Sequence, residues 1–167
     1  LTVTEAGTRR RAALHIVADQ EALAGFHRGG IEVLSADLPT FTEALERENH
    51  TLKRTLTDQR LFSGIGNAYS DEILFAARLS PFKMSTTLQT EEVHRLYEAT
   101  RSVLTEWRDR LVGEARKRFP AKVTAFREEM HVHGKYGQPC SVCGTPVQRI
   151  RYADNESNYC PTCQTEG

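Results

Sequence analysis

Two CxxC pairs restrict the folding of this chain more than any other feature of its sequence. Cys140 and Cys143 form the first pair, Cys160 and Cys163 form the second, and sixteen residues lie between them. This spacing is typical of a four-cysteine zinc site, in which the thiolates surround the ion tetrahedrally and leave no coordination position open. The pattern therefore predicts one structural Zn²⁺ bound by these four cysteines.

The alternative is a pair of disulfides in an exported protein. The first eleven residues are polar and end in three arginines, unlike a secretory signal. Residues 130–167 hold few large aliphatic side chains and cannot build a core of their own, which favours a segment folded by a metal. His131 and His133 could also bind a metal, but with four thiolates available we expect them to face an anion or water.

Composition excludes a membrane protein and indicates one charged segment. The chain has 167 residues, and no apolar run approaches the roughly 18 to 20 residues that a membrane span requires. Basic and acidic side chains number 22 each, yet residues 108–151 carry 10 basic against 4 acidic ones, a net charge of +6. Such a segment is either an anion-facing surface or a solvated helix face.

Hydrophobic periodicity predicts a mainly α-helical middle with β-structure at both ends. Asp37 followed by Pro39 is typical of a helix start, and apolar residues then recur at three-to-four spacing. Local alternation around Gly29-Gly30 predicts two or three short strands within residues 1–34, and alternation between the cysteine pairs predicts a hairpin. We expect helices over 37–49, 51–58 and 67–78, and a long helix that begins at Thr90.

The sequence SGIGN, residues 63–67, comes directly before one of these helices. Glycines let a backbone approach a ligand closely, and the free N–H groups at a helix N-terminus attract phosphate. A glycine turn between two packed helices is also a common structural device. The motif alone leaves both interpretations open.

With its surroundings, this turn resembles a known family. The stretch LKRTLTDQRLFSGIGNAYSDEILFAARLSP, followed by HGKYGQPCSVCGTP and NYCPTCQ, resembles the formamidopyrimidine-DNA glycosylase and endonuclease VIII (Fpg/Nei) family of base-excision repair enzymes. The resemblance implies a helix-two-turn-helix DNA-binding domain over residues 35–128 and a β-hairpin zinc finger over 129–167, which together bind damaged double-stranded DNA. It also implies that residues 1–34 are remnant strands of an N-terminal β-sandwich domain.

The resemblance assigns DNA-binding roles to particular residues. Gly66 and Asn67 match the family's phosphate-binding turn, and Lys53 matches a lysine near the lesion pocket. His133 and Lys135 match the motif before the finger that touches the DNA backbone. Cations, imidazoles and amides all hydrogen-bond phosphate oxygens, so these residue types suit the task. The alternatives are a solvated lysine at position 53 and a plain helix N-cap at position 67.

Two departures from the family affect the expected chemistry. The family's nucleophile is an N-terminal proline followed by a catalytic glutamate, whereas this sequence begins Leu1-Thr2. We therefore expect the DNA-binding portion of a DNA glycosylase/AP lyase, inactive by itself, whose full-length parent removes a damaged base through a Schiff base. Asn155 stands where the family has an arginine at the finger tip; an amide can contact DNA phosphate but supplies no fixed positive charge.

Other hypotheses stay open. Lys53 could itself be a Schiff-base nucleophile, with Arg54 nearby to lower its pKa. The zinc unit and helices could instead form a protein-interaction scaffold with no nucleic-acid role. Further expectations are a cytoplasmic, nucleoid-associated location and self-association through exposed N-terminal strands.

Overall fold

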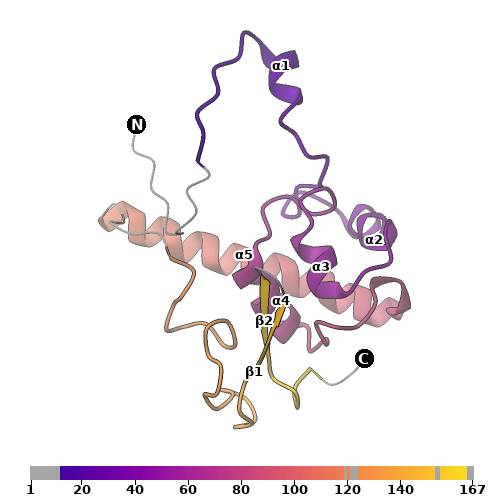
Figure 1. The fold of residues 1–167 in the computed structure, drawn as a ribbon, viewed down its shortest axis with the longest axis vertical. Coiled ribbons are helices and arrows are strands. Elements are labelled where there is room, and N and C mark those ends of the chain that lie inside the picture. Colours follow the sequence, from indigo (N-terminus) through magenta and orange to yellow (C-terminus); the bar gives the residue numbers. More distant parts are fainter. Residues whose placement is uncertain (1–11, 119, 121–123, 153–154, 165–167) are drawn as a thin grey trace.

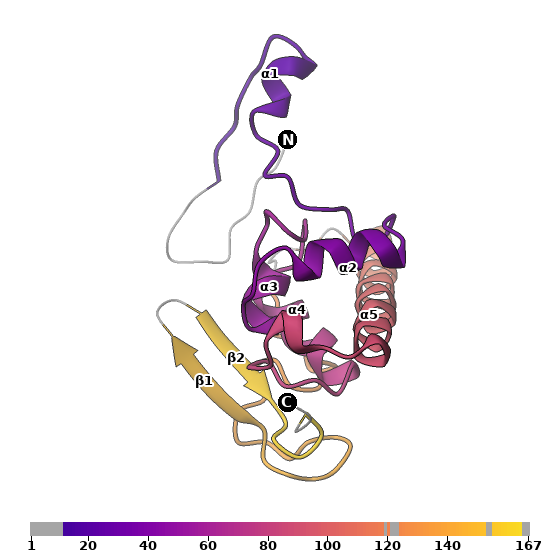
Figure 2. The same cartoon turned by 90° about the vertical axis from the view of Figure 1, so that its right-hand side faces the viewer.

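Helices form the body of the protein, and a small β-hairpin finger lies against one side of it (Figures 1 and 2). The computed structural model describes residues 12–118, 120, 124–152 and 155–164. The mainly helical fold with a C-terminal hairpin confirms the predicted fold class. The elements are α1 (Gln20–Ala24), α2 (Leu38–Glu46), α3 (Leu52–Thr57), α4 (Asn67–Ala76), the 3-10 helix η1 (Ser85–Thr87), α5 (Thr90–Lys117), β1 (Gln148–Tyr152) and β2 (Asn155–Tyr159).

Local capping chemistry sets where the helices begin. The Asp37 carboxylate accepts a hydrogen bond from the Thr40 N–H at 3.0 Å, and Pro39 lies in the first turn of α2. At α5, Gln89 and Glu92 form a reciprocal capping box, in which the Glu92 carboxylate accepts the Gln89 N–H at 2.9 Å. The predicted helix positions are confirmed to within a few residues at each end.

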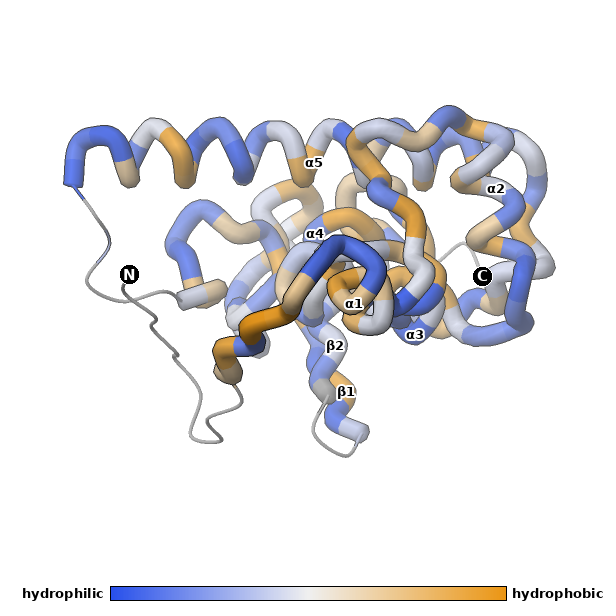
Figure 3. Tube along the Cα trace, turned by 90° about the horizontal axis from the view of Figure 1, so that it is seen from above, coloured by the Kyte–Doolittle hydropathy of each residue, from blue (hydrophilic) through white to orange (hydrophobic). Residues whose placement is uncertain are grey.

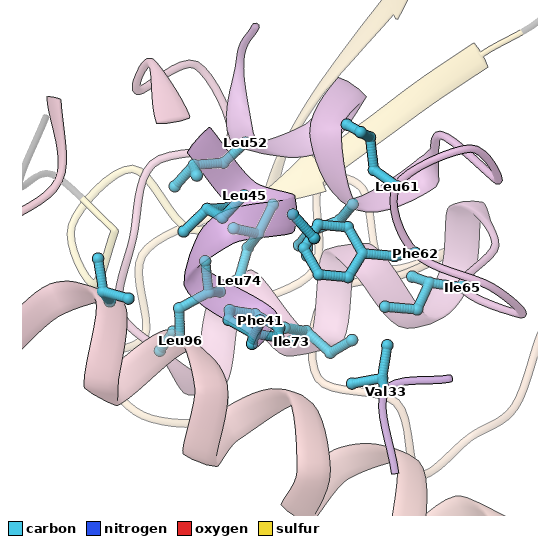
Figure 4. Packing of buried hydrophobic residues seen from close by; sticks show 14 of the residues in the cluster. Val33, Phe41, Leu45, Leu52, Leu61, Phe62, Ile65, Ile73, Leu74 and Leu96 are labelled. Atoms are coloured by element: carbon cyan, nitrogen blue, oxygen red, sulfur yellow. The ribbon is translucent and has the colours of Figure 1, made fainter. Parts of the chain in front are cut away.

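The core lies where α2, α3, α4 and α5 meet, and Figure 4 shows its side chains pointing toward one another. The rings of Phe41 and Phe62 pack at 5.0 Å, and Leu45, Leu74 and Leu96 are fully buried around them. α5 runs along one edge of this body, and its C-terminal turns project past the other helices (Figure 3). None of the helices in the described ranges combines the length and apolar character that a membrane span requires.

Residues 12–34 do not form the strands that the alternation predicts. They contain α1 and a single isolated bridge between Ile31 and Phe62, and residues 1–11 lie outside the described part of the chain. A strand needs a neighbouring strand to satisfy its backbone, and none is present beside this segment in the described structure. Ile31 instead pairs with the loop before α4, donating to the Leu61 carbonyl at 3.0 Å and accepting from Ser63 N–H at 2.9 Å.

The finger shares its core with the helical body. β1 and β2 pair antiparallel, from Gln148 opposite Tyr159 to Tyr152 opposite Asn155, as the alternation predicts. The small buried cluster beneath the finger combines Val132 and Val147 with Phe75 of α4. The predicted inability of residues 130–167 to build their own core agrees with this packing, because α4 supplies an aromatic ring.

Candidate nucleic-acid interface and metal centre

The four cysteines converge at one point of the finger, as their spacing predicts. Their sulfur atoms all lie within 4.8 Å of one another, and none is in a disulfide. Cys140 Sγ is 3.9 Å from Cys163 Sγ, and Cys143 Sγ is 3.4 Å from Cys160 Sγ. A tetrahedron with Zn–S bonds of about 2.3 Å has sulfur–sulfur edges of about 3.8 Å, so the observed cluster fits the ion.

Backbone groups around the cluster also suit thiolates. The Val142 N–H points to Cys140 Sγ at 3.5 Å, and the Cys163 N–H points to Cys160 Sγ at 3.4 Å. Burial, together with hydrogen bonding to the other three cysteine side chains, raises the pKa of the Cys163 thiol to about 12. Four thiolates so close together need a cation to compensate their charge, which a closed Zn²⁺ site supplies.

A glutamine amide shapes the turn before α4. Gly64 has φ of +80°, a conformation that favours glycine. The Gly64 N–H donates to Gln59 Oε1 at 2.9 Å, and Gln59 Nε2 donates to the Ile65 carbonyl at 2.8 Å. Gln59 was not among the residues predicted from the sequence, because the side chains that mark turns are those of Asn, Asp, Ser and Thr.

The N-terminus of α4 has no side-chain cap. Gly66 occupies the N-cap position and Asn67 is the first helical residue, so the alternative of a plain N-cap at Asn67 is wrong. Because glycine has no side chain to offer, the first N–H groups of α4 have no capping acceptor from it. Such a helix end is suited to a negatively charged group.

Lys53 points into the body instead of into solvent. Its ammonium group donates to the Asn67 carbonyl at 2.7 Å, to Ser70 Oγ at 2.9 Å and to Asp71 Oδ1 at 2.5 Å. Only 13% of its side chain is exposed, so the solvated-lysine alternative is wrong. Burial lowers the pKa of Lys53, although the Asp71 carboxylate opposes this shift. With all three hydrogens donated, the amine is poorly placed to act as a nucleophile.

His133 is buried at the start of the finger. The ring is stacked on Phe126 at 5.3 Å, and Nδ1 lies 2.9 Å from Asp71 Oδ2. Gly134 follows with φ of +73°, and a Cβ there would come within 2.8 Å of the Phe126 ring. His133 therefore faces an anion, as expected, but this anion is the internal carboxylate of Asp71; its contact with DNA stays a prediction. No ion pair engages Lys135 within the described ranges.

One cavity brings together three of the predicted DNA-binding residues. It has a volume of about 630 Å³, and Gly66 and Asn67 line it from the α4 side while His133 lines it from the finger side. Lys53 lines a neighbouring groove of about 620 Å³, which shares Asn67 and Glu156 with the first cavity. Lys135 lines neither space. Asn155 lies at the end of the hairpin, opposite Tyr152.

Arg151 of the hairpin lines this cavity, and Glu156 partly neutralises both Arg151 and Arg149. Arg151, 66% exposed, donates to Glu156 Oε2 at 3.3 Å, and Arg149 lies 4.4 Å from the centre of the Tyr136 ring. Burial raises the pKa of Glu156, but hydrogen bonds from Asn158 and Arg151 outweigh it and keep that pKa below its ordinary value. Glu156 is therefore an anion that pairs with both arginines of β1, of which Arg151 lines the cavity.

Two buried acids on α4 were also absent from the sequence prediction. Glu72 accepts the backbone N–H groups of residues 131–133, at distances of 2.8 to 2.9 Å. Asp71 contacts Lys53, His133 and Asn158. The signal in the sequence was a pair of adjacent acids within a helix that is otherwise largely apolar. Acidic side chains are rarely buried in proteins without a partner.

Comparison with known proteins places these features in one class. The model described as "Formamidopyrimidine-DNA glycosylase H2TH domain" matches residues 30–108, and the one described as "Zinc finger found in FPG and IleRS" matches residues 137–165. The fold and the metal centre thus define a helix-two-turn-helix domain joined to a four-cysteine zinc finger, and the predicted structural zinc site is confirmed.

The relatives include one of similar length to this chain and others that are about twice as long. An uncharacterized formamidopyrimidine-DNA glycosylase-like protein of Mycobacterium tuberculosis is 38% identical, over 83% of this chain and 85% of that protein. The formamidopyrimidine-DNA glycosylase of Thermus thermophilus is 41% identical, over 77% of this chain and 50% of the relative. This chain belongs to the formamidopyrimidine-DNA glycosylase (Fpg/Nei) family, and it spans about half the length of the glycosylases it matches.

Solved structures have the same fold. The crystal structure of MutM (Fpg) from Thermus thermophilus has a TM-score of 0.67 and 36% identity, and covers 89% of this chain and 58% of that one. Lactococcus lactis Fpg, bound non-covalently to DNA containing an AP site, has a TM-score of 0.72 and 28% identity, and covers 88% and 54%.

Proposed function

We propose that this chain binds damaged duplex DNA through its sugar-phosphate backbone. The observation that carries the proposal is the shared cavity, in which the uncapped N-terminus of α4 faces the finger-side residue His133. Helix N-termini, amides and cations are the groups that hold phosphate in proteins. The helical body and the finger thereby both present phosphate-binding groups to the same DNA strand.

The individual roles follow from position. Gly66 and Asn67 would hold a phosphate at the start of α4, and Lys135 and Asn155 would contact further phosphates from the finger. Lys53 would act indirectly, because its donors already fix Asn67 and Asp71. His133 would present Nε2 to the cavity, since its Nδ1 is held by Asp71. Such contacts fix the position of the protein on DNA without reading sequence.

The wider activity is proposed from the relatives. The Thermus relative is a formamidopyrimidine-DNA glycosylase, and the Lactococcus protein binds DNA with an AP site. We therefore assign this chain to the DNA-binding part of a glycosylase/AP lyase that removes damaged bases, and we assign no catalytic residue within it. The proposed location is the cytoplasm, in association with the nucleoid. The domain boundaries at 35–128 and 129–167 and self-association through the N-terminal segment stay predictions.

Charge reversal tests this proposal against the protein-scaffold alternative. We expect Lys135→Glu to weaken binding to a fluorescent duplex with an abasic-site analogue by about tenfold at low salt, because a phosphate contact becomes a repulsion. Arg149→Glu should act in the same direction. Arg47→Glu is the matched control, because this exposed arginine lies at the end of α2 and does not belong to the finger. Unchanged DNA affinity in both finger variants would support the scaffold instead.

A further inference from the structure

Glu72 holds the backbone that leads into the finger. Its Oε2 accepts the His131 N–H at 2.8 Å, and its Oε1 accepts the N–H groups of Val132 and His133, both at 2.9 Å. The carboxylate is buried, so these three charge-assisted bonds are shielded from water. One side chain of α4 thus fixes the path of three successive residues at the entrance to the finger.

Asp71, the neighbour of Glu72, connects further parts of the molecule. Its fully buried carboxylate accepts from Lys53 of α3, pairs with the imidazole of His133, and accepts from Asn158 of β2 at 3.2 Å. Ser157 Oγ lies 3.4 Å away. The two adjacent acids together contact α3, residues 131–133 and the hairpin, and so connect these parts to α4.

Besides the two acids, the finger contacts the body through a buried hydrogen bond from Gln164 Nε2 to the Leu79 carbonyl at 3.1 Å, and through Tyr159, whose ring lies edge-on to Phe82 at 5.1 Å. Its buried cluster is small and depends on Phe75 of α4, and the zinc ligands lie within the finger itself. A metal site closed by four finger cysteines fixes the finger internally but not its angle to the helices. A buried carboxylate, by contrast, tolerates few arrangements, because it is costly unless its donors stay in place.

From this geometry we infer that Asp71 and Glu72 are positioning residues that join the finger and the helical body into one DNA-binding unit. The inference rests on the proposed function, since it concerns how the two sides of the cavity are held in register. Neither acid lines the cavity, and both carry the wrong charge to contact phosphate. They act through His133 and through the backbone of residues 131–133.

The inference is tested by measuring whether the effect of one substitution on DNA binding depends on a second substitution, which is the coupling between the two sites. Asn67→Ala and Lys135→Ala are each combined with Glu72→Ala, and binding to the abasic-site duplex is measured for every variant. In the native background we expect Lys135→Ala to weaken binding several-fold. In the Glu72→Ala background its effect should fall below about twofold, and the salt slope should become clearly shallower than that of the native chain, as the finger cations lose their phosphate contacts.

Controls separate positioning from general damage. Zinc content must stay at one ion per chain in Glu72→Ala, and Glu72→Gln, which keeps one acceptor oxygen, should restore part of the coupling. Asp37→Ala removes the N-cap of α2 far from the finger and should leave the coupling intact despite lower stability. Amide hydrogen exchange at residues 131–133 should accelerate in Glu72→Ala and stay unchanged in Asp37→Ala.

The outcomes distinguish this inference from the proposed function. A native chain that fails to bind the duplex at low salt overturns both. The inference alone is overturned if the native chain binds the duplex and the Glu72→Ala variant behaves like it. In that case the variant keeps its zinc and the full salt slope, and Lys135→Ala weakens its binding as much as it weakens that of the native chain. Unchanged exchange at residues 131–133 in Glu72→Ala contradicts it independently of DNA.

Discussion

At the scale of single residues, Lys53 shows how burial changes the role of a charged side chain. Its ammonium group serves three acceptors inside the protein, one of them the backbone carbonyl of Asn67. Sequence position suggested a DNA contact or a solvated cation. The geometry makes Lys53 a support for the start of α4, which is the helix end that faces the cavity.

The lowered pKa of Lys53 predicts a sign for the pH dependence of stability. Between the folded-state pKa and the ordinary value of 10.5, the unfolded chain binds more protons than the folded chain at this site. The free energy of unfolding of the native chain should therefore rise relative to that of Lys53→Met as the pH increases through this window. Urea unfolding at a series of alkaline pH values measures the difference. A relative fall would mean that attraction to Asp71 outweighs the cost of burial.

Two glycines of one turn should respond differently to alanine. Gly64 has φ of +80°, so Gly64→Ala should cost about 1–2 kcal/mol of stability. Gly66 has φ of −104°, and a Cβ there meets no atom within 4 Å, so Gly66→Ala should change stability by less than about 0.5 kcal/mol. Because that methyl group lies in the cavity, it should still weaken DNA binding. Chemical denaturation and anisotropy titration, run on both variants, separate the two effects; equal stability losses would contradict this assignment.

At the scale of elements, the zinc finger and the helical body differ in what holds them together. The main core consists of residues from 31 to 104 and includes none of the cysteines. Within the described residues, the finger has a small cluster, whose buried members include Cys140 and Cys160. The body should therefore keep its structure without metal, while the finger should not.

Metal removal tests this difference. We expect a strong zinc chelator to abolish binding to the duplex while the far-ultraviolet circular dichroism of the helices changes little. Zinc added back should restore binding, and Cys143→Ser should reproduce the chelated state. Loss of most helical signal on chelation would show instead that the metal holds the whole fold.

Elements defined by local patterns were predictable from the sequence, and elements defined by distant partners were not. The cysteine spacing, the Asp37 cap and the periodicity of α5 lie within short stretches, and each leads to the observed structure. The alternation before residue 34 indicated strands but could not supply a partner for them. The roles of Asp71 and Glu72 depend on residues 59 to 62 positions further along the chain, and no local pattern encodes such contacts.

At the scale of the whole molecule, the arrangement of two dissimilar parts is the basis of the proposed function. The helical body supplies an uncapped helix end, and the finger supplies an imidazole and nearby cations. The net charge of the chain is zero, so general attraction to DNA is weak, and binding depends on where the cations are placed. The excess of positive charge in residues 108–151 lies partly on the finger and partly on α5.

The salt dependence of duplex binding tests this account most directly. If roughly four phosphates are neutralised, the logarithm of the binding constant should fall against the logarithm of salt concentration with a slope near −3.6. The measurement uses the native chain with zinc bound and a duplex that contains an abasic-site analogue. A slope near −3.6 is the result we predict, and a slope near zero, or no binding at low salt, would contradict the account.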